Sequence, residues 1–153
     1  MHLAVLLCAG RERNFALEDA AFLTDDALII DESDGIRALP SHASLRLWED
    51  SIEALVPDGT PKAGAVSYSS KARLLAGDAL RYAAEPVVLL AAFKLEWHEV
   101  DGVDLRPLAG SALHLAWIEN SFLLDIEDRH LLARHFEWTH RNAERVPTIR
   151  LDY

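Results

Sequence analysis

The chain lacks the residue types and runs on which several classes of protein depend. Cys8 is its one cysteine, which excludes a disulfide framework and a cluster of thiolate metal ligands. No apolar run reaches the roughly 18 to 20 residues that a membrane-spanning helix needs. In a secretory signal a basic segment precedes the apolar run, but no basic segment precedes the apolar residues 3–9 of this chain. We therefore expect a cytoplasmic protein without a membrane segment.

Positive charge is also scarce. The chain has 15 lysines and arginines against 25 aspartates and glutamates, and its formal net charge is −10. Such a surface repels the phosphates of nucleic acids. The arginines that gather late in the chain, such as Arg129 and Arg134, are interleaved with acidic residues, which is typical of a solvated helix face. We expect no nucleic-acid partner.

The remaining composition is that of a globular protein. Hydrophobic residues make up 50% of the 153 residues and charged residues 26%. This length suits one core of ordinary size, and no repeat or Pro/Gly/Ser linker divides it. The sequence therefore predicts a single domain over residues 1–153.

Short aliphatic runs bounded by turn residues predict strands. These are expected at residues 27–30, 36–39, 45–47, 87–97, 103–105 and 148–153. The first two form a hairpin around the acidic turn 31–35, and residues 87–97 form the longest strand, buried on both faces. The run at residues 2–10 fits either a strand or a helix.

Helical spacing is found in the middle and in the last third of the chain. It connects Trp48 with Ile52, Leu55 and Val56. Later, Ser111 is expected to cap a helix that carries Leu113, Ala116, Trp117 and Asn120 on one side, and Asp125 to cap a helix with the stripe Leu132, Phe136, Thr139 and Ala143. Strands mixed with helices indicate the α/β class, with a mixed sheet.

An acidic pair, Asp25 and Asp26, stands at the edge of the aliphatic strand 27–30. A carboxylate in such a place can hold a magnesium ion, and a second one can orient or deprotonate a nucleophilic hydroxyl. An ordinary acidic turn before a strand is the alternative. The pair alone does not decide between them.

Several further segments lie in a characteristic order along the chain. They are residues 22–30, 39–51, 70–74, 106–111, 125–129 and 145–151, together with the strand after Pro86. In this order and spacing, the chain resembles the bacterial HPr serine kinase-like family over roughly residues 20–153. These proteins are relatives of HPr kinase/phosphorylase.

The resemblance implies a fold related to that of phosphoenolpyruvate carboxykinase. It also implies phosphoryl transfer from ATP, with Mg²⁺, to a serine of a protein or peptide. Carried over to this sequence, Asp25 would be the acid/base carboxylate and Asp26 its partner at the metal. Arg46 and Lys71 lie in matching segments and would place positive charge near phosphate.

The chain departs from this family in its phosphate-binding loop. The family has a glycine-rich loop that ends in Gly-Lys-Ser/Thr before the acidic pair, but here Gly10 is the one glycine before Asp25 and the first lysine is Lys62. Residues 1–9 match either the helix that follows the loop or the strand before it. We expect a domain truncated at both ends. HPr kinase proper also has a glycine-rich signature after the acidic pair, and this sequence has no match to it.

Two functions therefore stand side by side. The chain is either a serine kinase by descent, weak or inactive without its loop, or a non-catalytic pseudokinase that binds a peptide or a partner protein. A homo-oligomer that covers exposed strands is a further expectation. Metal binding by His130, His135 and His140 is not expected, because a spacing of five residues steps around a helix.

Overall fold

The computed structural model describes residues 2–4, 21–25, 27–49, 52–53, 56, 58–64, 70–78, 80–96, 102–123 and 125–152. These residues form three small sheets and two helices, which confirms the α/β class. The chain divides into two compact units, one of residues 7–89 and one of residues 1–6 with 90–153. The expectation of a single domain stays a prediction.

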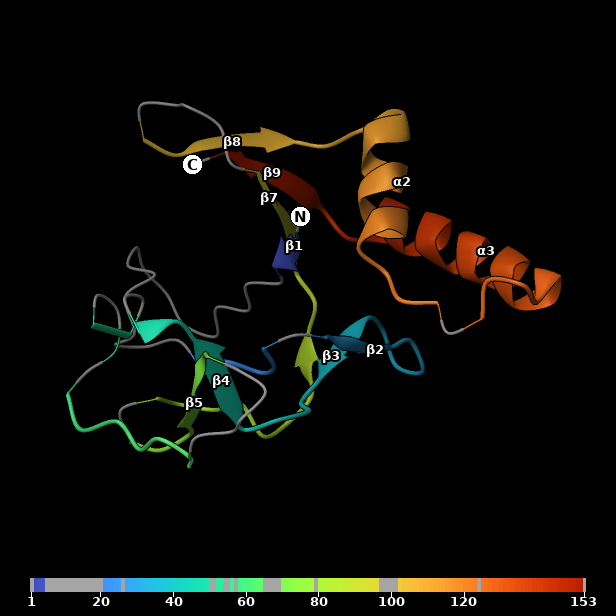
Figure 1. Ribbon diagram of the computed structural model, residues 1–153. Helices are drawn as coiled ribbons and strands as arrows, with labels where there is room; N and C mark the ends of the chain where they lie inside the picture. Colours follow the sequence, from blue (N-terminus) through green and yellow to red (C-terminus); the bar gives the residue numbers. More distant parts are fainter. Residues whose placement is uncertain are drawn as a thin grey trace. The chain divides into compact units, whose positions relative to one another are not determined.

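A four-stranded sheet organises the unit that contains the C-terminus (Figure 1). Its strands lie in the order β1 (His2–Ala4), β7 (Ala92–Glu96), β9 (Thr148–Asp152) and β8 (Asp104–Pro107). The pair β7–β9 is parallel and the other two pairs are antiparallel. The sheet is therefore mixed, as expected. β9 confirms the strand predicted at the C-terminal end, and in the run 2–10, for which strand and helix were both open, residues 2–4 form the strand β1.

Two helices, α2 (Gly110–Glu119) and α3 (Arg129–Arg145), stand between β8 and β9 in the chain. The predicted caps are wrong at both. Ala109 precedes α2 without a side-chain bond, and Asp128 caps α3 by accepting the N–H groups of His130 and Leu131. Asp125 instead accepts the N–H groups of Glu127 and Asp128 in the turn before the helix. Two aspartates three residues apart offer the same capping chemistry, so composition alone did not choose between them.

Half of the predicted apolar stripe of α3 is buried. Thr139 is 1% exposed and Ala143 2%, but Leu132 is 46% exposed and Phe136 59%. Only the C-terminal half of the helix therefore presents this stripe to a protein core. A 3.6-residue period marks which side chains share a face, but it does not fix how much of that face is covered.

A buried hydrogen bond ties α2 to β9. The indole Nε1 of Trp117 donates to Thr148 Oγ1 at 3.0 Å, and the same hydroxyl donates to the carbonyl oxygen of Val146 at 3.0 Å. Trp117 is 2% exposed and Thr148 4%. The hydroxyl therefore satisfies a donor and an acceptor that water does not reach.

The predicted strand 87–97 is wrong as one continuous element. It is divided into β6 (Val87–Val88) and β7, which belong to different sheets and different units. Leu90 between them is 69% exposed, so burial on both faces is also wrong. β7 carries an ion pair between Lys94 and Glu96 at 2.9 Å. An aliphatic run does not reveal where a strand changes its partners.

The other unit holds the two smaller sheets. One has the order β2 (Ile29–Asp31), β3 (Arg37–Leu39) and β6, and the other pairs β4 (Ser44–Leu47) with β5 (Ala72–Leu75). The predicted hairpin is confirmed, with Gly35 at φ 83° in its turn. Strand β5 was missed by the sequence analysis.

A small apolar core supports β4 and β5. Ile52, Leu74 and Leu80 are its buried members, and Leu45 and Leu47 of β4 pack against it. Backbone bonds from Ile52 to Trp48 and from Val56 to Ile52 agree with the predicted helical spacing. Leu55 lies outside the described residues. Within the described part of the chain, no helix is both long and apolar enough to cross a membrane.

Replacing Thr148 by valine tests the bond between α2 and β9. Thr148→Val keeps the shape but leaves the Trp117 N–H without its acceptor, so we expect the free energy of unfolding to fall by about 1–3 kcal/mol. Urea denaturation measures the change. Thr148→Ser, which keeps the hydroxyl, should lose less; equal stability of wild type and Thr148→Val would contradict this role.

The β2–β3 turn predicts a pH dependence. The Ser33 hydroxyl, and then the Ser33 N–H, donate to Asp31 and lower its pKa below the ordinary value of an aspartate. The stabilisation is therefore complete above the unfolded pKa of about 3.9 and is lost as pH falls through the lower, folded pKa. In an NMR titration, Ser33→Ala should raise the pKa of Asp31 more than Arg37→Gln does, because the charge of Arg37 is the smallest cause.

Candidate functional site

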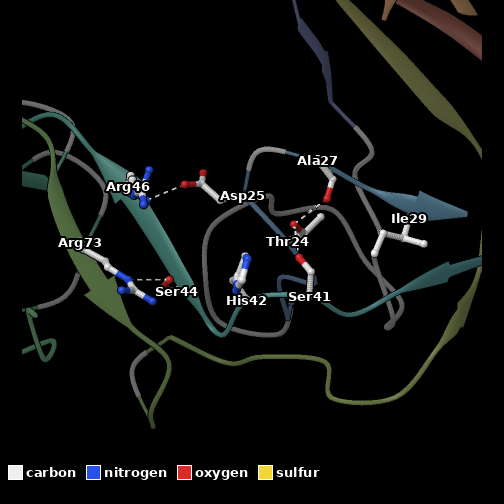
Figure 2. Close-up of a pocket in the computed structure, with 9 residues that line it drawn as sticks. All are labelled: Thr24, Asp25, Ala27, Ile29, Ser41, His42, Ser44, Arg46 and Arg73. Carbon is white, nitrogen blue, oxygen red and sulfur yellow. Dashed lines mark hydrogen bonds between the residues drawn. The ribbon is translucent and has the colours of Figure 1, made fainter. Parts of the chain in front are cut away.

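A pocket of about 440 Å³ lies in the unit formed by residues 7–89. Its lining combines hydroxyls, basic groups and one carboxylate with two apolar side chains (Figure 2). The lining residues are Thr24, Asp25, Ala27, Ile29, Ser41, His42, Ser44, Arg46 and Arg73. They come from three separate stretches of the chain, so the fold is needed to assemble them.

Hydroxyl groups join two of these stretches. Thr24 Oγ1 donates to the carbonyl oxygen of Ala27 at 2.9 Å and lies 2.7 Å from Ser41 Oγ. The Ser41 N–H bonds to the Leu23 carbonyl at 3.4 Å. These contacts hold the segment before β2 beside the segment that leads into β4. They thereby place Asp25 next to the start of β4.

Asp25 is bound to β4 through the backbone. Its Oδ2 accepts the N–H of Arg46 at 2.8 Å, and Figure 2 shows the carboxylate directed at that strand. The family resemblance implied a role at the site for both Asp25 and Arg46, and the fold brings them together in one pocket. The backbone N–H of Arg46 therefore fixes the place of the carboxylate.

The two arginines of the pocket face each other across β4 and β5. Arg46 and Arg73 are direct partners in this antiparallel pair, so their side chains leave the same face of the two strands. Like charges directly opposite one another destabilise a sheet. An anion bound between the two arginines would relieve this repulsion. The negative charge of Asp25, which lines the same pocket, offsets one of the two positive charges.

Ser44 positions one of these guanidinium groups. Its Oγ accepts a hydrogen bond from Arg73 Nε at 3.0 Å, and Ser44 is only 7% exposed. A buried acceptor on β4 therefore fixes the direction of an exposed side chain on β5. The remaining N–H groups of a guanidinium form a planar fork that matches a phosphate or a carboxylate.

The other expected site residues are placed differently. Asp26 lies outside the described residues, so its predicted role at a metal is untested. Lys71 does not line the pocket; its Nζ lies 5.4 Å from the ring centroid of Trp48. In this position the ammonium group is held by a cation–π contact. The structure therefore joins two of the four expected residues.

Sequence reasoning missed Arg73, Ser44 and Thr24. The signal for Arg73 was its apolar neighbour Leu74, which is fully buried in the structure. Side chains alternate along a strand, so the side chain of Arg73 must leave the opposite face. Residues 72–75 were not identified as a strand, so this alternation was not used. The pairing of Arg73 with Arg46 depends on a register that no local pattern reveals.

The described lining of the pocket does not supply the donors that ATP with Mg²⁺ needs. A nucleotide-binding loop surrounds the phosphates with backbone N–H groups and a lysine. Among the described lining residues there is no glycine and no lysine, and Asp25 is their one carboxylate. The lining instead fits a single anionic group between two guanidinium groups, next to hydroxyls. It does not carry the donors that a triphosphate requires.

No protein-family model, curated protein or solved structure matches the chain.

Proposed function

We propose that the chain is an HPr serine kinase-like protein, by descent an ATP-dependent serine kinase, whose pocket holds a protein or peptide. The proposal rests on the meeting of Asp25 and Arg46 in the pocket through a 2.8 Å bond. Both residues lie in segments that carry the family resemblance. Asp25 would face the hydroxyl of a substrate serine, as the resemblance implies.

A kinase without the phosphate loop, for which the sequence in hand has no matching motif, would be weak or inactive. Phosphoryl transfer depends almost entirely on the positioning of phosphates and on electrostatic stabilisation of the developing charge. Without backbone donors and a lysine for the β- and γ-phosphates, we expect a loss of several orders of magnitude in rate. Binding through the pocket does not depend on those donors. A pseudokinase that recognises a peptide or a partner protein is therefore the form of the proposal that the pocket supports best.

An edge strand beside the pocket favours an extended peptide as the occupant. Among the described strands β2 stands at the end of its sheet, and Ile29 of β2 lines the pocket while 54% exposed. The edge of a sheet can pair with an added strand through main-chain hydrogen bonds. A peptide that extends β2 would pass the pocket and place a side chain in it.

The arginine pair favours an anionic side chain at that position. Arg46 and Arg73 together carry two positive charges, and Asp25 offsets one of them. A phosphoserine or an acidic residue of the peptide would supply the negative charge that balances the other arginine. It would also accept hydrogen bonds from both guanidinium groups. We therefore expect a phosphoserine peptide to bind more tightly than its unmodified counterpart.

Substitution of Arg73 tests the anionic specificity. With a phosphoserine peptide library as the probe, we expect Arg73→Gln to weaken binding about tenfold, the equivalent of about 1.4 kcal/mol, by removing a charge-assisted hydrogen bond. Fluorescence polarisation measures the affinity. Arg81→Gln, an equal loss of charge in the same unit but outside the lining, should bind as wild type does; equal losses in both variants would refute a role for the pocket.

Titration with ATP and Mg²⁺ tests the catalytic side of the proposal. We expect no magnesium-dependent heat in isothermal titration up to millimolar nucleotide, because the donors for the triphosphate are missing. We also expect no transfer of labelled phosphate to a library of serine peptides. Asp25→Asn removes the acid/base carboxylate, and Asp58→Asn is the matched control outside the pocket.

The outcomes separate three functions. Transfer that is lost in Asp25→Asn but kept in Asp58→Asn would make the protein an active kinase and overturn the pseudokinase form. Peptide binding that is indifferent to ATP supports the pseudokinase. If neither phosphate transfer nor peptide binding is found, self-association remains. Analytical ultracentrifugation would then show association that rises with protein concentration, as a homo-oligomer requires.

A further inference from the structure

Three potential metal ligands meet where α2 and α3 pack against each other. His114 comes from α2, and His140 and Glu144 come from α3. One ligand atom from each of the three side chains lies within 4.8 Å of the other two. The cluster belongs to the unit of residues 90–153 and not to the unit that holds the pocket.

The two imidazole rings are close enough to share one ion. His140 Nδ1 lies 3.0 Å from His114 Nε2, and the ring centroids are 4.5 Å apart at an angle of 58°. Two nitrogens bound to one tetrahedral zinc, each at about 2.0–2.1 Å, are about 3.3 Å apart. The observed separation therefore differs from that of a zinc site by a few tenths of an ångström.

Helical spacing supplies the third ligand. His140 and Glu144 are four residues apart on α3, so they lie one above the other on the same face. The 3.7 Å contact of Glu144 Oε1 is with His140 Nε2, whereas His140 Nδ1 faces His114. One ion binds only one of these two nitrogens, so the side chains must turn slightly to bring three ligand atoms, which lie within 4.8 Å of one another, onto it. The exposed fraction of the side chain is 50% for His140 and 62% for Glu144. Both side chains can therefore adjust by rotation to bind an ion without disturbing the core.

We propose that His114, His140 and Glu144 bind a divalent transition-metal ion, with zinc as the best match. Two imidazoles and one carboxylate are a ligand set that zinc accepts, and three protein ligands leave the fourth position open to water. The bound ion joins α2 to α3 by coordination. It also replaces the single proton that the two facing imidazole nitrogens otherwise share.

Earlier along α3 the histidines have other roles. His135 Nε2 lies 2.9 Å from Ser121 Oγ, and its ring stacks on Trp138 with centroids 6.3 Å apart. His130 is exposed in the first turn of the helix. The expectation that His130, His135 and His140 do not bind a metal together stays a prediction. The metal site instead needs a ligand from α2, which a search along one helix does not find.

Competition for Zn²⁺ with a chromogenic chelator tests the site on the tag-free protein. Loss of an outer-shell partner already weakens metal binding about 10- to 100-fold, so loss of a ligand in His114→Ala or His140→Ala should weaken it at least about 100-fold. Glu144→Gln should also weaken it. Two matched controls lie on α3: His130→Ala removes an imidazole outside the cluster, and Glu137→Gln removes a carboxylate from the same side of the helix.

Two further readouts identify the mode of binding. Zn²⁺ should raise the thermal unfolding midpoint of the wild type and of both controls, but not that of the three ligand variants, since binding to the folded state stabilises it. Co²⁺ in the same site should show the strong visible absorption of four-coordinate cobalt. Circular dichroism without metal confirms that each variant is folded.

The proposal would be overturned by an affinity for Zn²⁺ that is the same in His114→Ala and in wild type, because binding would then arise from scattered surface histidines. Absence of Zn²⁺ binding by the wild type would overturn it as well, leaving a hydrogen bond between two imidazoles. Neither result would affect the peptide-binding proposal, which rests on Asp25, Arg46 and Arg73 in the other unit.

Discussion

The register between β4 and β5 is the constraint on which the pocket depends. Leu74 is fully buried in the core with Ile52 and Leu80, and side chains alternate along a strand, so Arg73 must leave the opposite face. The same register sets Arg46 directly across from Arg73. A slip by one residue would expose Leu74 and separate the two arginines. Burial of one leucine thus stabilises an arrangement of charges that is unfavourable by itself.

This arrangement gives an acidic protein a local preference for anions. The chain carries a formal net charge of −10, so its surface as a whole repels anionic ligands at long range. Among the described lining residues of the pocket, two guanidinium groups and the carboxylate of Asp25 leave a surplus of one positive charge. Selection there must rely on hydrogen bonds at short range, which screening by salt affects less than long-range attraction. A ligand gains most if it combines an anionic group with a backbone that can pair with β2.

The sequence predicted the elements that local chemistry determines. The β2–β3 hairpin followed from an aliphatic run and an acidic turn that ends in Gly35, and β9 followed from the run after Pro147. It failed where the outcome depends on distant partners. The run 87–97 changes sheets at Leu90, and β5 was not recognised because residues 72–75 alone show too short a pattern. The acidic pair and the family resemblance pointed to Asp25, and the resemblance alone pointed to Arg46. Arg73 instead required the pairing of two strands far apart in the chain, as its bond to Ser44 across 29 residues shows.

Binding and phosphoryl transfer make unequal demands on such a pocket. Transfer requires a second site that aligns the β- and γ-phosphates with the serine hydroxyl, and a displacement of about 1 Å can already cost about 100-fold in rate. Recognition of a phosphate already attached to serine requires only the donors that surround its final position. Arg46 and Arg73 meet that smaller demand without a glycine-rich loop. Since recognition makes the smaller demand, the proposed partner is to be sought first among phosphoserine peptides.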